Sequence, residues 1–379
     1  MAKEKELFAL SDPSALPHRP HNPLTNFEGF KLGVFSANAD GGLALTTVPE
    51  RWGASWTDNM EAARIADEGG LDFFLPIARW RGFGGRTRAR EHSFETFTWA
   101  SALAAVTRRM AIFATVHVPL IHPIYAAKAL ATVDHVSGGR AGLNIVCGWK
   151  PDEFAMFGTA PDAQGYDRAE EWLDIIERAY TADTPFDYAG RYYTLKGVVS
   201  RPASLQIPRP VTMNAGFSPP GREFAAKRCD FLFSTFTNME DGARHVADIH
   251  GRASNHGRHV DIYTVCHVVC RRTLQEAQDA YDRYARHEAD HEAVDAHMAG
   301  KQSHSGSHDD EAYILHRQRF AGGAGSYGLI GTPQSIADEI VEIQRQGYCG
   351  AALSFLNYTQ ELPYFCAEIL PLLKKANLR

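Results

Sequence analysis

The chain has 379 residues, of which 44% are hydrophobic, and 39 basic against 45 acidic side chains give a formal net charge of -6. This composition predicts a globular protein with a large core, and the mild, interspersed charge disfavours nucleic acid as a partner. No stretch approaches the about 20 apolar residues of a membrane span, and the polar start lacks the apolar run of a secretory signal. We therefore expect a cytoplasmic protein with no membrane association.

The chain alternates short apolar runs with helical patterns from Phe30 onward, after an N-terminal stretch, residues 1–26, whose four prolines predict an irregular arm. Alternation of this kind is typical of βαβ units. The predicted strands are Lys31–Phe35, Phe73–Ile77, Ala111–Val116, Ala141–Val146, Val211–Asn214, Phe231–Thr235, Ile262–Val269 and Ala352–Leu356. The predicted helices are Thr57–Glu68, Thr96–Val106, Ile124–Val136, Asp167–Tyr180, Gly221–Cys229, Met239–Ser254, Leu274–Ala289, one that begins at Pro333, and Leu362–Leu373. Eight strands with their helices predict a closed (β/α)₈ TIM barrel, an α/β fold that takes residues 1–379 as a single domain.

Two segments exceed a minimal barrel. Phe186–Arg209 carries tyrosines around Gly190 and predicts a hairpin inserted before the fifth strand. Ala299–Gly328 is rich in Gly, Ser and His, so we expect an insertion that fills no core position. This second segment is interpreted either as a mobile lid over a site or as a plain linker.

The most informative motif runs from Gly138 to Trp149, where a glycine-rich turn leads into an apolar strand that contains Asn144. Barrels bind their ligands at the carboxyl ends of their strands. A buried amide without a partner costs about 1–3 kcal/mol, so Asn144 needs either a ligand or neighbouring backbone to satisfy it. The sequence pattern alone fits either a ligand or neighbouring backbone as the partner of this amide.

Two further loops follow strands. The glycines and arginines of Arg79–Arg86 suit close approach to an anionic ligand, although surface arginines that merely solvate a loop fit equally well. Asn214–Gly221 places Ser218 before a helix, where it can bind phosphate or, as the more common reading, simply cap the helix.

One metal motif is present, because His287-Glu288-Ala289-Asp290-His291 matches H-E-x-x-H. On one helix, His287 and His291 would share a face and bind zinc. The surrounding charged residues give little apolar stripe, whereas a zinc hydrolase buries its site helix. We therefore expect no metal and retain the zinc hydrolase only as an alternative.

From Phe30 to Leu373 the chain resembles the flavin-dependent monooxygenases of the bacterial luciferase-like family, in particular its pyrimidine monooxygenase and dimethylsulfone monooxygenase branches. Arg81-Gly82-Phe83-Gly84-Gly85 is similar to a motif of the first branch, and Leu329-Ile330-Gly331-Thr332-Pro333 is similar to the second. The run Ala131–Arg140, followed by Asn144 and Trp149, resembles the family as a whole.

The resemblance implies a cofactor, reduced FMN, and a set of site residues. The implied FMN contacts are Ala78, Arg79, Asn144, Trp149, Glu153, Tyr166, Gly216 and Ser218. The implied O₂ pocket is lined by Leu75, Thr115, Asn144 and Ile145, and the implied substrate contacts are Arg79, His117 and Trp149. The chain departs from the pyrimidine branch at Gly165, where that branch has Arg, so we expect phosphate binding to depend more on Ser218 and backbone. It also has Arg79 where that branch has Lys, which changes the donor geometry, so the substrate need not be the same.

The resemblance implies a two-component monooxygenase. A separate NAD(P)H-dependent flavin reductase would supply FMNH₂, because no NAD-binding turn is visible in the chain. The substrate would be a small heterocyclic amide or nitrogen ring, or an organosulfur compound. A homodimer or homotetramer is expected, and the main alternative to an enzyme is a non-catalytic flavin-binding barrel.

Overall fold

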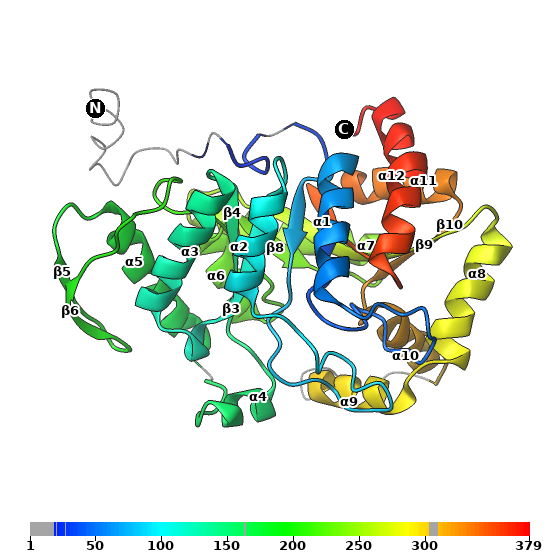
Figure 1. The fold of residues 1–379 in the computed structure, drawn as a ribbon, viewed down its shortest axis with the longest axis horizontal. Coiled ribbons are helices and arrows are strands. Elements are labelled where there is room, and N and C mark those ends of the chain that lie inside the picture. Colours follow the sequence, from blue (N-terminus) through cyan, green and yellow to red (C-terminus); the bar gives the residue numbers. More distant parts are fainter. Residues whose placement is uncertain (1–18, 20, 27, 163, 303–309) are drawn as a thin grey trace.

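The computed structural model describes residues 19, 21–26, 28–162, 164–302 and 310–379 (Figure 1). Eight parallel strands close into a barrel, because pairing runs in the order β8-β9-β11-β1-β2-β3-β4-β7 and returns to β8. Their bounds are β1 (Lys31–Phe35), β2 (Phe73–Leu75), β3 (Ala111–His117), β4 (Ala141–Val146), β7 (Val211–Asn214), β8 (Phe231–Ser234), β9 (Asp261–Cys270) and β11 (Gly350–Ser354). The predicted (β/α)₈ barrel is confirmed.

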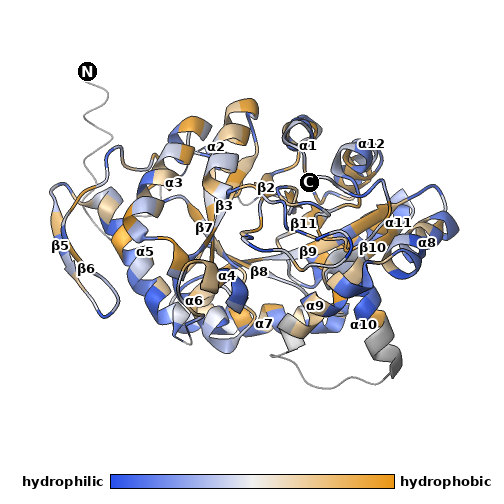
Figure 2. Ribbon diagram, turned by 60° about the horizontal axis from the view of Figure 1, so that its bottom comes forward, coloured by the Kyte–Doolittle hydropathy of each residue, from blue (hydrophilic) through white to orange (hydrophobic). Residues whose placement is uncertain are grey.

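Helices surround this barrel, and the hydrophobic colour in Figure 2 gathers on the central strands while surface helices such as α8 and α12 show much hydrophilic colour. The helices are α1 (Trp56–Gly69), α2 (Thr96–Val106), η2 (Val118–Leu120), α3 (Pro123–Ser137), α4 (Pro151–Met156), α5 (Gly165–Thr181), α6 (Pro219–Arg228), α7 (Met239–Asn255), α8 (Leu274–Asp282), η3 (Arg283–His287), α9 (His291–Gln302), α10 (Asp310–Gly323), α11 (Pro333–Arg345) and α12 (Tyr358–Lys375). Helix α11 begins as predicted, with Pro333 in its first turn and Thr332 and Ser335 in a capping box. Within the described part of the chain, no helix combines the length and apolarity that crossing a membrane demands.

Large and small side chains alternate around the inside of the barrel. The rings of Phe73, Phe113 and Tyr263 meet edge to face, with centroids 5.6–6.2 Å apart. A Cβ atom on Gly142 would lie 2.6 Å from the Phe113 ring, and one on Gly33 would lie 2.4 Å from Phe73. Glycine at these two strand positions therefore makes room for the aromatic ring of the neighbouring strand.

The two predicted insertions have different outcomes. The hairpin before the fifth barrel strand is confirmed, with β5 (Phe186–Ala189) antiparallel to β6 (Thr194–Val198). The expectation that 299–328 fills no core position is wrong, since α10 buries Phe320 and Ala321. In addition, β10 (Tyr327–Gly331) begins within that range and pairs with the second half of β9. Residues 303–309 lie outside the described residues, and a lid in this segment stays a prediction.

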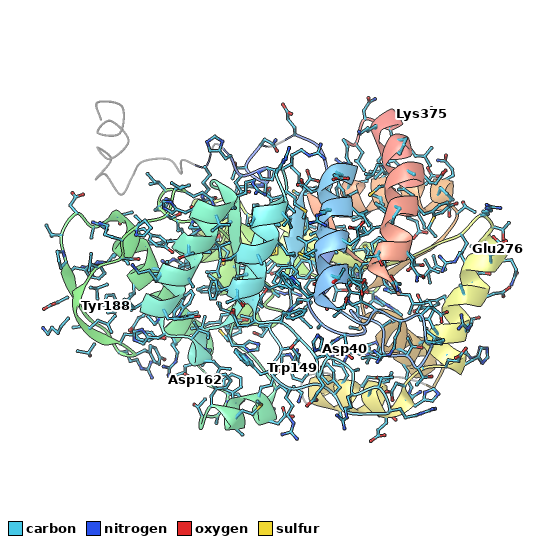
Figure 3. All side chains as sticks on the ribbon, in the orientation of Figure 1. Asp40, Trp149, Asp162, Tyr188, Glu276 and Lys375 are labelled. Atoms are coloured by element: carbon cyan, nitrogen blue, oxygen red, sulfur yellow. The ribbon has the colours of Figure 1, made fainter. Side chains whose placement is uncertain are left out.

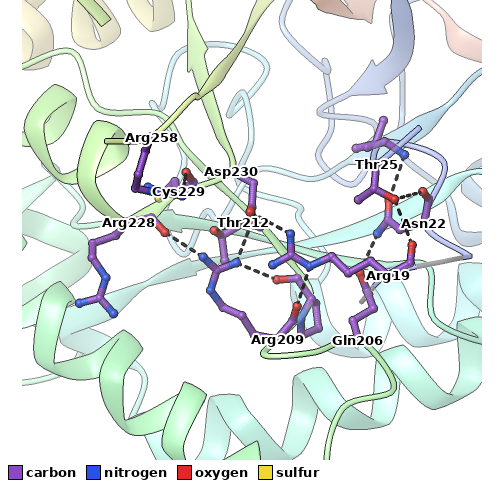
Figure 4. A network of polar contacts seen from close by, with 12 residues as sticks. Arg19, Asn22, Thr25, Gln206, Arg209, Thr212, Arg228, Cys229, Asp230 and Arg258 are labelled. Carbon is purple, nitrogen blue, oxygen red and sulfur yellow. Dashed lines mark hydrogen bonds and ion pairs between the residues drawn. The ribbon is translucent and has the colours of Figure 1, made fainter. Parts of the chain in front are cut away.

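The predicted N-terminal arm lies mostly outside the described residues, but its last part packs on the amino-terminal end of the barrel (Figure 4). The Asp230 carboxylate accepts hydrogen bonds from Arg19 (2.8 Å) and Arg209 (2.6 Å). Asn22 donates to the carbonyl of Ala141 at the start of β4. The opposite, carboxyl-terminal end of the strands is left for the loops that carry the predicted site.

Candidate active site at the carboxyl ends of β2, β3 and β4

Three of the predicted oxygen-pocket residues share the inner face of the barrel. Thr115 and Asn144 are register partners on β3 and β4, and Leu75 belongs to the buried cluster that fills the barrel interior. The Thr115 hydroxyl donates to the Pro76 carbonyl (2.5 Å) and accepts from Asn144 Nδ2 (3.3 Å). Asn144 Oδ1 is buried and has no hydrogen-bond partner among the described residues. Neighbouring backbone therefore does not satisfy Asn144, and one of its N–H bonds and its oxygen remain for another group.

Ile145, the fourth predicted member of this pocket, does not join the other three. Its side chain belongs to the large cluster between the strands and the outer helices, together with Leu143 and Val116. Successive residues of a strand point to opposite faces, so Asn144 and Ile145 cannot both line one chamber. Only the backbone of Ile145 is near, and its carbonyl accepts from Asn214 Nδ2 (2.7 Å).

His117 ends β3 as a buried, neutral imidazole. Burial, reinforced by the nearby Arg79 cation, lowers the pKa of His117 from about 6.5 to about 3. Its Nδ1 atom has no hydrogen-bond partner in the part of the chain that the structure describes. Gly148 bends beneath it with φ +79, and a Cβ there would lie 3.3 Å from the imidazole. The ring therefore offers an uncharged hydrogen-bonding group at neutral pH.

Arg79 and Glu153, both predicted to contact FMN, form a buried ion pair. Arg79 Nη1 lies 3.0 Å from Glu153 Oε1, with side chains 10% and 1% exposed. The same Oε1 accepts from the amides of Trp80 (2.8 Å) and Arg81 (3.2 Å). Arg79 Nε is buried, and no described residue accepts a hydrogen bond from it. Glu153 on α4 thus fixes the loop after β2, while Ala78 lies half-buried just before the pair.

An aromatic stack covers this ion pair, and the sequence did not predict all of it. The Arg79 guanidinium lies 5.2 Å from the Phe83 ring centroid and 5.7 Å from that of Trp149. Trp149 is labelled in Figure 3, and His297 of α9 stacks on Phe83 with centroids 4.2 Å apart. His297 could not be found from the sequence, because no motif connects it with a loop more than 200 positions earlier.

The predicted phosphate-binding residues gather at the end of β7. The amide of Gly216 donates to Asn214 Oδ1 (2.7 Å), and a Cβ on Gly216 would lie 2.7 Å from the Tyr166 hydroxyl. Burial is the main cause that raises the pKa of Tyr166 above its usual value. Ser218 caps α6 by accepting from the amide of Gly221 (3.3 Å). Since the first two helical residues of α6 are prolines without N–H groups, this end offers fewer amides than we expected.

The arrangement fits a bound flavin. Unpartnered buried polar atoms on Asn144, His117 and Arg79 lie at the carboxyl ends of neighbouring strands. A flavin ring and a substrate beside it together carry donors and acceptors that can satisfy such atoms, which otherwise cost about 1–3 kcal/mol each. A separate cavity of about 830 Å³ opens between α8 and α12, and none of the predicted site residues lines it.

The zinc alternative conflicts with the local backbone. His287 ends η3 and His291 begins α9, with non-helical residues between them. Glu288, which would activate water, accepts instead from Arg283 (2.8 Å). The two imidazoles therefore do not share one helical face, which the H-E-x-x-H arrangement requires.

Comparison with known proteins decides the family. The family model described as luciferase-like monooxygenase matches residues 30–349. The chain belongs to the luciferase-like monooxygenase family. It is 28% identical to an FMNH₂-dependent dimethylsulfone monooxygenase of Pseudomonas putida, over 91% of this chain and 95% of that protein. It is 29% identical to the pyrimidine monooxygenase RutA of Acinetobacter baylyi, over 90% of this chain and 94% of that protein. The predicted enzyme class is thus confirmed, and the first relative's name carries the predicted cofactor.

Solved structures in this group share the barrel. The luciferase-like chain superposes on a long-chain alkane monooxygenase, LadA, with a TM-score of 0.81 and 22% identity, covering 93% of this chain and 92% of that one. It superposes on DmoA from Hyphomicrobium sulfonivorans with a TM-score of 0.78 and 20% identity, covering 92% and 89%. These likenesses support the fold, while the role of each site residue stays a prediction.

Proposed function

We propose that this luciferase-like protein is the oxygenating component of a two-component monooxygenase, which takes FMNH₂ from a separate flavin reductase and oxygenates a small organic molecule. The observation that carries the proposal is the set of unpartnered buried polar atoms on Asn144, His117 and Arg79 at the carboxyl ends of β2 to β4. The names of the relatives support FMNH₂ and support dimethylsulfone or a pyrimidine as starting points for the substrate.

Reduced FMN, when bound, supplies the electrons that activate O₂. The residues of the chain supply position and environment. Leu75 lines the inner face and excludes water from it, which strengthens every hydrogen bond made there. Asn144 Nδ2 can donate its second N–H toward charge that develops on oxygen, while the Thr115 hydroxyl, already donating to Pro76, orients the Asn144 amide.

A reconstitution assay tests the proposal. The protein is supplied with FMN, NADH, a flavin reductase and O₂. Both O₂ uptake and oxygenated product are followed with dimethylsulfone, uracil and related compounds, including ones that carry a carboxylate, sulfinate or sulfonate group. We expect product from at least one compound, with O₂ consumed in proportion. Tight retention of FMN without product from any compound would instead favour a non-catalytic flavin-binding barrel.

Two further predictions, the number of subunits and the lid, are tested beside this assay. We expect a homodimer or homotetramer by light scattering. The predicted lid, 299–328, includes residues 303–309 between α9 and α10, and shortening these should raise the release of H₂O₂ without product, because a lid would no longer shield the reaction. Unchanged coupling between O₂ uptake and product would show that this segment is a linker.

A further inference from the structure

The loop after β2, which we call the arginine loop (residues 79–90), carries five arginines in twelve residues of a chain whose net charge is negative. Arg86 and Arg88 are exposed, and neither forms an ion pair with any residue that the structure describes. Arg90 is fully buried and donates to the carbonyls of Gly42 (2.9 Å) and Leu43 (3.1 Å) instead of to a carboxylate.

Three cationic side chains lie near the ring of Phe83 at the barrel mouth. The guanidinium of Arg79 lies 5.2 Å from its centroid, that of Arg90 lies 5.3 Å away, and Lys150 Nζ lies 5.8 Å away. The aromatic face attracts these cations, but this attraction is weaker than pairing with an anion, which a cation removed from water requires. Trp149 stacks beside Phe83, with ring centroids 6.3 Å apart.

Carboxylates are fewer than cations here, and they are already engaged. Glu153 holds Arg79, and Asp152 contacts both Lys150 and, at 3.6 Å, Arg81. The other two, Glu91 and Asp290, accept from backbone amides of the loop. Six cationic side chains, Arg79, Arg81, Arg86, Arg88, Arg90 and Lys150, thus stand against four carboxylates, Glu91, Asp152, Glu153 and Asp290. The mouth keeps a surplus of positive charge.

The backbone gives an independent reason to ascribe a use to the exposed arginines. Arg88 has φ +49 and Arg90 has φ +61, in the left-handed region where glycine or asparagine is the favoured residue. Arg90 is compensated by its two hydrogen bonds to carbonyl groups. Arg88 has no such compensation within the described residues, so its strained position indicates a side chain kept for a ligand.

The surplus does not belong to the predicted cofactor phosphate. That phosphate is expected at Ser218, which follows β7, whereas the arginine loop follows β2. Between these two strands, the barrel order places β3 and β4. A second anion is therefore needed to account for the charge over β2.

We infer that the substrate carries an oxyanion group of the carboxylate, sulfinate or sulfonate class, drawn in by the arginine loop and held between Arg79 and His117. This inference rests on the proposed function, since it takes the substrate to enter at the same mouth. Arg79 Nε donates to the group, and His117 Nδ1 adds a neutral N–H. Exposed Arg86 and Arg88 raise the rate of encounter, because clefts of one sign focus the field on an approaching charge.

A pair of probes of nearly equal shape tests the charge preference. Benzoate and benzamide differ mainly in charge, and the binding of each to the FMN-loaded protein is measured by calorimetry and by stopped-flow absorbance of the flavin. We expect a Kd for benzoate about tenfold below that for benzamide at low salt, and a smaller ratio as ionic strength rises. Arg79→Gln should bring the ratio close to one.

Arg88→Gly provides a variant that relieves backbone strain and so keeps the fold. It should slow association of benzoate about two- to threefold and leave its dissociation rate unchanged, as expected for a rim charge. Arg64→Gln removes an arginine on α1 that is 48% exposed, and it should change neither rate. The association of FMN is measured beside that of riboflavin, which has the same ring system without the phosphate.

The outcomes separate the two claims. Equal Kd values for benzoate and benzamide in a protein that retains FMN would overturn the oxyanion inference alone. Slower association of FMN but not of benzoate in Arg88→Gly would assign the loop to the cofactor phosphate and would also overturn it. Failure of the wild-type protein to bind FMN in either redox state would overturn the proposed function and this inference together.

Discussion

The ion pair between Arg79 and Glu153 makes a quantitative prediction. Its charged atoms lie 3.0 Å apart, so with an effective dielectric constant of about 20 the gross attraction is about 5 kcal/mol. Desolvation of two nearly buried groups offsets most of that gain, which leaves a small net contribution. Glu153→Gln keeps an oxygen for the amides of Trp80 and Arg81 and removes only the charge. We expect it to lower the free energy of unfolding by about 3 kcal/mol, because Arg79 is then buried without a counter-ion.

The compensating change is the decisive part of the test. Arg79→Met alone should also destabilise the protein, whereas the double variant with Glu153→Gln should unfold within about 1–2 kcal/mol of the wild type. Urea denaturation followed by circular dichroism gives the four free energies of the cycle. If the effects of the two substitutions simply add, the two side chains do not depend on each other and the proposed anchoring of the loop is wrong.

Three further substitutions test other parts of the barrel. Asn144→Ala should lower product formation at least about 100-fold and leave the FMN dissociation constant within about threefold, as measured by flavin fluorescence. His117→Asn should flatten the dependence of stability on pH: the folded pKa of about 3 lies below the unfolded value of about 6.5, so stability is complete above pH 6.5 and falls toward pH 3 by at most about 1.4 kcal/mol per pH unit. Gly142→Ala should cost about 1–3 kcal/mol of unfolding free energy, because its Cβ meets Phe113.

Each of these has a control or a contrary result. Normal product formation by Asn144→Ala would remove that amide from the reaction. An unchanged slope of stability between pH 4 and 6.5 in His117→Asn would mean that another group titrates there. Gly251→Ala on α7, where a Cβ meets nothing within 4 Å, serves as the control for Gly142→Ala and should be neutral or slightly stabilising.

The eight barrel strands could be predicted, because each is a dense apolar run between turn residues, whereas one strand that pairs outside the closed barrel could not. The missed strand, β10, is Tyr-Gly-Leu-Ile-Gly, whose two glycines in five residues resemble the glycine-rich stretch before it. Helix α10 was missed for a similar reason, since Phe320 and Ala321 stand beside two glycines that indicate a loop. In both cases packing against β9 and the barrel mouth outweighs weak local preference.

Site residues could be predicted where they lie at the end of a recognisable strand. They were missed where their place in the site depends on contacts between distant parts of the chain. Asn144 and Thr115 are polar residues in buried strands, so each needs a partner, and the structure pairs them. Ile145 was grouped with them although it has the opposite parity along β4. Ser218 was predicted to precede a helix start that can bind phosphate, but Pro219 and Pro220 form the first helical residues, and their missing N–H groups reduce what that start can bind.

One carboxylate joins two segments at the barrel mouth that lie far apart in the sequence. Asp290 accepts from the amide of Arg86, 204 positions earlier, and from Thr87. Contacts of such long sequence separation form late, because the entropy cost of closing a large loop comes before the contact can stabilise the fold. A nascent chain that ends before α9 would thus contain β2, β3 and β4 but would lack the carboxylate of Asp290, which holds the loop after β2 at the rim of the barrel. The rim of the candidate site would then take its final form only after residue 290 has been synthesised, so this rim depends on a much longer part of the chain than the strands beneath it do.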